Sequence, residues 1–138
     1  MSELARIVEY FESLTPESVA RLGEHYAGNA CFKDPFNEVE GLERIQRIFA
    51  HMFRQLEAPR FRVTDRVADA GGAMLAWEFT FRMRGRAMLI RGATHLRFDS
   101  LGKVVYHRDY WDAAQELYAK LPLLGGLMRL LQRRLTAS

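Results

Sequence analysis

The sequence has a single cysteine, Cys31, and no uninterrupted apolar segment long enough to cross a membrane. One cysteine can form neither an internal disulfide nor a zinc site built from cysteines, and it suits a reducing compartment. The longest apolar run, residues 121–128, contains Pro122 and two glycines and is far shorter than the roughly 20 residues of a membrane-spanning helix. The first residues carry an acid before their first base and do not resemble a secretion signal. We therefore expect a cytoplasmic protein.

The sequence also has little excess charge of either sign. Its 20 Lys and Arg residues face 17 Asp and Glu residues, which gives a net charge of +3, and the bases are scattered among acids. This balance does not indicate a nucleic-acid partner. At 138 residues and 49% hydrophobic content, the chain is long enough for one domain with a buried core, and a second independent core is not expected.

Helical spacing of apolar residues predicts three helices in the first third of the chain. They cover residues 4–14, a segment that begins at Thr15-Pro16 and continues through Leu22, and residues 41–56. Residues 26–31 contain glycine and asparagine, so we expect a loop there. The apolar period then changes to two, which predicts strands over residues 61–67, 75–84, 88–98 and 104–111. The pattern is typical of an α+β fold, with an antiparallel sheet covered on one side by helices.

The motifs along the chain resemble the nuclear transport factor 2-like superfamily. They are Asp34-Pro35-Phe36, a glycine that opens the third helix, and a last strand that ends in Asp109-Tyr110-Trp111. This superfamily includes ketosteroid isomerases, SnoaL-like polyketide cyclases and limonene-epoxide-hydrolase-like enzymes. The resemblance covers residues 1–118. It implies a cone-shaped, curved antiparallel sheet wrapped by three N-terminal helices, a cavity for a small hydrophobic molecule, and a homodimer without a cofactor.

Residues 119–138 are additional and form a leucine-rich, amphipathic segment with several arginines. We predict a C-terminal helical tail that packs on the sheet or on a second subunit. A basic helix that lies on a membrane surface is the alternative. The dimer is expected to form through the sheet face that carries Arg91, His95 and Arg97.

The ketosteroid isomerase pattern, carried over to this sequence, implies two catalytic residues. Asp34 would be the base that moves a proton next to a carbonyl, and Tyr10 would donate a hydrogen bond to the developing oxyanion. Thr94 stands where the isomerases have a protonated aspartic acid, and threonine is the weaker donor. Each residue also has a simpler interpretation, because aspartate before proline commonly stabilises a turn and a helical tyrosine can serve packing alone.

The last strand contributes a second candidate pair. Strand alternation places His107, Asp109 and Trp111 on one face, and the resemblance makes this the cavity face. His107 beside Asp109 could act as an acid/base pair or could form only an internal hydrogen bond. Phe32, Phe36, Thr94 and Trp111 would contact the ligand. Asp34, His107 and Asp109 could also bind a metal, but no spacing motif demands it, and we expect none.

The end of the last strand also resembles the epoxide hydrolases, in which an Asp-Arg-Asp set activates water. Their spacing leads to Ala76 and Glu78, so the arginine is missing and this activity is disfavoured. Two hypotheses remain. The first is an isomerase-like or cyclase-like enzyme, and the second is a non-catalytic module for ligand binding or dimerisation. Convergence of Asp34, Tyr10 and His107 on one point would favour the enzyme.

Overall fold

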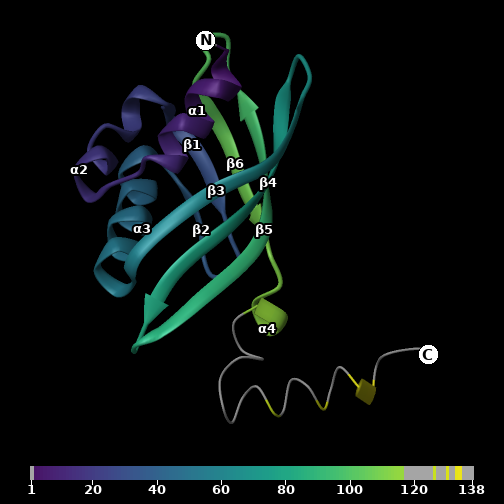
Figure 1. Cartoon of the computed structure of the whole chain (residues 1–138). Coiled ribbons are helices and arrows are strands. Elements are labelled where there is room, and N and C mark those ends of the chain that lie inside the picture. The colour runs from purple at the N-terminus through teal and green to yellow at the C-terminus, as the bar shows by residue number, and fades with distance from the viewer. Residues whose placement is uncertain (1, 117–125, 127–129, 131–132, 135–138) are drawn as a thin grey trace.

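Helices cover one face of a curved, open six-stranded sheet in the computed structural model (Figure 1). The structure describes residues 2–116 together with residues 126, 130, 133 and 134. Apart from those four positions, the expected tail at 119–138 lies outside the described residues. Within the described part of the chain, no helix combines the length and the apolar character that crossing a membrane requires.

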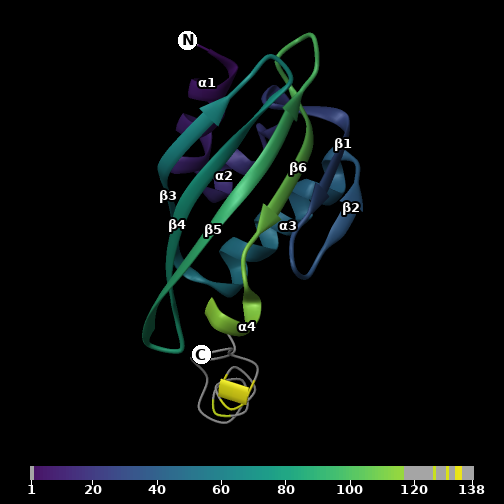
Figure 2. The same cartoon turned by 90° about the vertical axis from the view of Figure 1, so that its right-hand side faces the viewer.

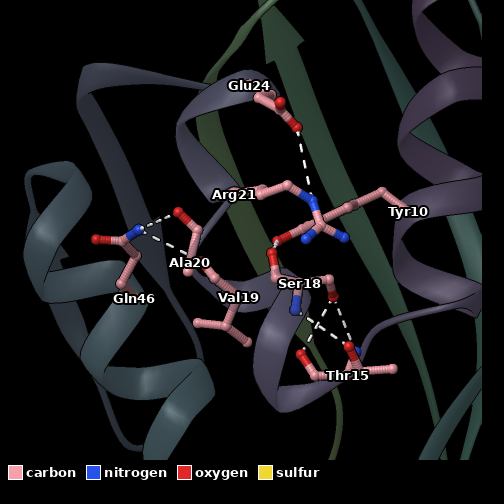
Figure 3. Close-up of polar contacts among 8 residues, drawn as sticks. All are labelled: Tyr10, Thr15, Ser18, Val19, Ala20, Arg21, Glu24 and Gln46. Carbon is pink, nitrogen blue, oxygen red and sulfur yellow. Dashed lines mark hydrogen bonds and ion pairs between the residues drawn. The ribbon is translucent and has the colours of Figure 1, made fainter.

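The helices begin at residues suited to cap them. Ser2 accepts a hydrogen bond from the backbone N of Ala5 at 3.0 Å and starts α1 (Glu3–Glu12). Thr15 and Ser18 cap each other reciprocally at the start of α2 (Pro16–Val19), as Figure 3 shows. Gly41 precedes α3 (Leu42–Gln55) with a φ of 110°, a conformation that favours glycine.

The second helix is shorter than the sequence predicted. It is a single turn, α2, followed by a separate 3-10 turn, η1 (Leu22–Glu24). Gly23 lies where another α-helical turn would continue, and glycine disfavours a helix interior. A last short helix, α4 (Ala113–Glu116), follows the sheet.

The sheet has the strand order β2-β1-β6-β5-β4-β3. Its long hairpin series is β3 (Glu57–Ala68), β4 (Gly72–Met83), β5 (Arg86–Phe98) and β6 (Val104–Tyr110), which are antiparallel neighbours. The predicted alternation is confirmed, since Leu75, Trp77 and Phe79 on β4 are buried while their sequence neighbours are not. Figure 2 shows the sheet in front, with α1, α2 and α3 behind it. The core therefore lies between this inner face and the helices.

The expectation of a loop at residues 26–31 is wrong, because this segment belongs to β1 (Tyr26–Lys33). Tyr26 and Ala30 are buried, and β1 pairs with β6 in parallel, so the sheet is not wholly antiparallel. The register shifts between Tyr26 and Cys31, and the glycine and asparagine that indicated a loop lie within that irregularity. The other neighbour of β1 is the short antiparallel strand β2 (Glu38–Glu40).

The sheet face that is not covered by the helices carries the residues expected at a dimer interface. Arg91 and Arg97 are exposed and His95 is partly exposed on this face of β5. Arg62 and Glu78 form an ion pair across β3 and β4, with 3.3 Å between their side chains. The homodimer stays a prediction.

Candidate functional site

A chain of hydrogen bonds connects five side chains on the inner face of the sheet. The phenol oxygen of Tyr26 lies 2.5 Å from Nδ1 of His107, and Nε2 of His107 lies 2.7 Å from Oδ1 of Asp109. Oγ1 of Thr94 lies 2.5 Å from the same Oδ1, and Nε1 of Trp77 lies 2.7 Å from Oγ1 of Thr94. Asp109 is thus the meeting point of two branches, one from β1 through β6 and one from β4 through β5.

The chemistry of these groups sets the direction of each bond. An indole N–H can only donate, so Trp77 donates to Thr94, and the hydroxyl hydrogen of Thr94 is then directed to Asp109. An ionised carboxylate only accepts, so Nε2–H of His107 donates to Asp109. Neutral imidazole then accepts at Nδ1 from the hydroxyl of Tyr26. Both branches therefore donate to one oxygen, Oδ1 of Asp109, while its Oδ2 accepts no hydrogen bond from any described residue.

Burial strengthens this arrangement. Tyr26, Thr94 and His107 are 1%, 3% and 4% exposed, and 17% of the Asp109 side chain is exposed. Every buried polar side-chain atom in the described part of the chain has a hydrogen-bond partner. A fully partnered buried network fixes the orientation of its members, because leaving any one of them unpartnered is costly.

Aromatic rings surround the imidazole of His107. The ring centroids of Phe32, Phe11 and Phe49 lie 4.7, 5.7 and 6.4 Å from its centroid. Phe32 is 3% exposed, so it packs in the core around His107. These phenylalanine rings pack against His107 and surround the hydrogen-bonded network with apolar groups.

A pocket of about 590 Å³ opens next to Asp109, where the carboxyl ends of β1 and β6 lie side by side. Parallel pairing brings these ends to one edge of the sheet. The pocket is lined by Lys33, Asp34, Pro35, Arg108, Asp109, Tyr110, Trp111 and Asp112. The Phe36 ring packs edge-on against Trp111 with 5.5 Å between centroids, so the pocket combines carboxylates with aromatic surface.

Asp34 lines this pocket and also stabilises the turn after β1. Its Oδ1 accepts hydrogen bonds from the backbone N–H groups of Phe36 at 2.8 Å and Asn37 at 2.6 Å. The Asn37 side chain donates to the same carboxylate. The structure thus brings Asp34 and Asp109 to one pocket. Asp34 also stabilises the turn, which is the simpler of the two interpretations given above for this residue.

Tyr10 is not brought to this pocket. Its hydroxyl donates to the backbone carbonyl of Ser18 at 2.7 Å, and its ring stacks on His25 with 4.2 Å between centroids (Figure 3 shows the Ser18 contact). Asp34, Tyr10 and His107 therefore do not converge on one point. The Ser18 contact links α1 to α2, which is the packing role expected of a helical tyrosine.

The position of Tyr10 leads to a prediction for alkaline solution. Burial raises the pKa of Tyr10 from 10.0 to about 12. Its contribution to folding is therefore complete below pH 10 and is lost as the pH rises towards 12, because the unfolded chain ionises first. Urea unfolding should show that the stability difference between the wild type and Tyr10→Phe decreases between pH 10 and pH 12. A difference that does not change over this range would contradict the assignment.

The remaining predicted residues are divided between the pocket and the buried network. Trp111 lines the pocket with Phe36 packed against it, whereas Phe32 and Thr94 lie in the buried region around Asp109. Glu78 pairs with Arg62 on the opposite face of the sheet, so it cannot join Asp109 in an epoxide-hydrolase arrangement. In the described ranges, no three His, Cys, Asp or Glu side chains are grouped closely enough to hold a metal ion.

Sequence reasoning missed two members of the network, Tyr26 and Trp77. Trp77 belongs to the regular apolar alternation of β4, which by itself indicates only packing, and its cross-strand relation to Thr94 depends on the β4–β5 register. Tyr26 fell in the segment expected to be a loop. A signal for Tyr26 was present, since Tyr26, Ala30 and Phe32 are apolar positions of one strand face, but Gly28 and Asn29 obscured it.

Comparison with known proteins gives the same fold. Residues 7–107 match the SnoaL-like domain family. An LEH-like epoxide hydrolase of M. tuberculosis has a TM-score of 0.71 at 17% identity over 95% of this chain and 96% of its own. A protein of ketosteroid isomerase-like fold from Catenulispora acidiphila DSM 44928, in complex with trimethylamine, has a TM-score of 0.71 at 16% identity, with coverages of 83% and 88%. A SnoaL-like polyketide cyclase of Shewanella putrefaciens CN-32 has a TM-score of 0.68 at 19% identity, with coverages of 80% and 89%. No curated protein matches the sequence.

Proposed function

The chain belongs to the SnoaL-like domain family, within the nuclear transport factor 2-like superfamily, and we propose that it transfers a proton on a small carbonyl compound, with Asp109 as the base. The compound binds in the pocket at the carboxyl ends of β1 and β6. Isomerase-like and cyclase-like reactions both need such a step. The fold alone does not select the reaction, so the support comes from the groups at the pocket.

One observation supports Asp109 most directly: its two carboxylate oxygens have different surroundings. Oδ1 accepts from His107 and Thr94, and both donors are buried and held in turn by Tyr26 and Trp77. No described residue donates to Oδ2, and Asp109 lines the pocket, so we assign Oδ2 to the ligand. A base needs a fixed orientation and one available oxygen, and this arrangement provides both.

The proposed reaction needs no group beyond the substrate and this carboxylate. Oδ2 takes a proton from the carbon next to the carbonyl, and the electron pair of the broken C–H bond forms a carbon–carbon double bond as the carbonyl becomes an enolate. In a β,γ-unsaturated ketone this enolate is conjugated with the second double bond, so the protonated carboxyl can return the proton to the γ-carbon, which shifts that double bond and restores the carbonyl and the Asp109 carboxylate. Trp111, Pro35 and Phe36 offer apolar surface for the hydrocarbon part of the substrate.

The position of Tyr10 favours a second candidate, a ligand-binding module without catalysis. The expected oxyanion donor is engaged by Ser18 and lies outside the pocket. Without a donor that stabilises negative charge on the carbonyl oxygen, enolate formation loses a major source of catalysis. In this case the pocket binds the same carbonyl compound and releases it unchanged.

An isomerisation assay distinguishes the two candidates. The probe is the β,γ-unsaturated isomer of cyclohexenone, which becomes the conjugated ketone when the proton moves and is followed by ultraviolet absorbance. We expect the wild-type protein to accelerate the reaction above the rate with the same concentration of heat-denatured protein. Equal rates, together with binding detected by protein NMR at residues of the pocket, would favour the non-catalytic module and contradict proton transfer on this probe.

A further inference from the structure

Tyr26 is a buried tyrosine that neither the sequence motifs nor the proposed reaction includes. It lies at the start of β1, is 1% exposed, and places its hydroxyl oxygen 2.5 Å from Nδ1 of His107. The rings of the two residues stack with 5.9 Å between their centroids. A phenol that is hydrogen-bonded to an imidazole in the core can determine which ring nitrogen of the imidazole carries the proton.

The imidazole of His107 has two polar neighbours in the described part of the chain, Tyr26 at Nδ1 and Asp109 at Nε2. Its other close neighbours are the phenylalanine rings described above, which can neither donate to Nδ1 nor accept from Nε2–H. The partner of one ring nitrogen determines which tautomer is present at the other. A hydroxyl that donates to Nδ1 therefore keeps the proton of the neutral ring on Nε2, facing Asp109.

The Tyr26 hydroxyl is suited to remain a donor. Burial raises the pKa of Tyr26 well above its usual value, and the negative charge of Asp109 adds to this effect. The phenol therefore holds its proton more strongly than an exposed tyrosine does. Among the described residues, Nδ1 of His107 is the acceptor that this hydroxyl contacts.

We infer that Tyr26 is a positioning residue for Asp109 that acts through His107. By donating to Nδ1, it fixes the ring so that Nε2–H binds Oδ1 of Asp109 and leaves Oδ2 facing the ligand. The catalytic part of this inference, the positioning of Asp109 as a base, rests on the proposed function. The contact itself, and its effect on the tautomer of His107, can be tested without any substrate.

The test is nitrogen NMR of protein labelled in its histidine rings, with the His107 signals assigned by His107→Gln. In the wild type we expect Nε2 to be protonated, and Nδ1 to be unprotonated with the shift of a hydrogen-bond acceptor. Tyr26→Phe should remove the acceptor shift at Nδ1 and speed the exchange of the Nε2 proton with water by about tenfold, the effect of one lost hydrogen bond. A protonated Nδ1 in the wild type would overturn the inference even if the variant failed to fold.

Tyr10→Phe is the matched control, because it also removes a hydroxyl from a buried tyrosine but one that contacts Ser18 instead of His107. Its His107 signals should match those of the wild type. If both variants shift His107 equally, the effect is a general loss of stability and the inference is wrong.

The isomerisation assay separates this inference from the proposed function. If Asp109 is the base, Tyr26→Phe should lower kcat about tenfold while KM stays near its wild-type value. Full activity in Asp109→Asn would refute the proposed function, while the NMR result would still decide whether Tyr26 sets the tautomer of His107. An unchanged kcat in Tyr26→Phe, with activity lost in Asp109→Asn, would overturn the inference and leave the proposed function intact.

Discussion

Replacing Asp109 with asparagine is expected to lower kcat for isomerisation of the unsaturated ketone on the order of a hundredfold to ten-thousandfold, the usual contribution of a general base. Asparagine keeps an oxygen that can accept from His107 and Thr94, so the buried network has its acceptor. Its amide nitrogen takes the place of Oδ2 and cannot accept a proton from carbon. The loss should therefore appear in kcat, with little change in KM, when initial rates are measured over a range of ketone concentrations.

Asp34→Asn is the matched control for this prediction because Asp34 lines the same pocket. An asparagine oxygen can still accept the backbone N–H groups of Phe36 and Asn37, so the turn should persist. We expect activity near that of the wild type. If Asp34→Asn loses activity and Asp109→Asn keeps it, the base is Asp34, as the isomerase pattern implied, and our assignment of Asp109 is wrong.

Gly92→Ala should destabilise the protein by about 1–3 kcal/mol, the usual cost of overpacking a well-packed core. Gly92 pairs with Trp77 across β4 and β5, and the indole lies directly over it. A Cβ atom on Gly92 would lie 2.5 Å from Cη2 and 2.6 Å from Cζ2 of Trp77, and 3.0 Å from the Tyr110 carbonyl oxygen. The indole must move, and its bond to Thr94 is weakened. Urea unfolding followed by circular dichroism measures the loss.

Gly28→Ala provides the comparison, since Gly28 is exposed in β1 and a Cβ atom there would meet nothing within 4 Å. Its free energy of unfolding should stay within about 0.5 kcal/mol of the wild-type value. Equal losses in the two variants would mean that the space occupied by Trp77 is not the cause. Tryptophan fluorescence of the folded proteins should change in Gly92→Ala and not in Gly28→Ala.

Much of the sheet could be predicted because the alternation of apolar residues in the sequence identifies its inner face. Leu75, Trp77 and Phe79 alternate with smaller or less buried residues over a long strand, and the turns that follow contain glycine at the expected places. Such regular alternation leaves one face to bury, and the hairpins then fix which strands are neighbours. The same regularity correctly placed His107 and Asp109 on one face of the last strand.

The prediction failed at β1, and the candidate site was affected directly. Local turn propensity at Gly28 and Asn29 suggested a loop, but burial of Tyr26 and pairing with β6 prevail over that propensity. Tyr26 was therefore overlooked as the partner of His107. Tyr10 was assigned from a family spacing, and no local pattern could show that its hydroxyl meets Ser18, because that contact depends on how α1 packs against α2.

The parallel pairing of β1 with β6 also has a consequence for how the molecule folds. Strands β3 to β6 are joined by hairpins and can form in sequence order, whereas Lys33 meets Arg108 only after most of the chain has been synthesised. Contacts between residues so distant in sequence form slowly, because closing the intervening chain costs entropy before the contact is gained. Asp34 and Asp109 are brought together by this late step. On the ribosome, a nascent chain that ends before β6 would contain the segments of the three N-terminal helices and of the β3–β5 hairpins but would lack the pocket.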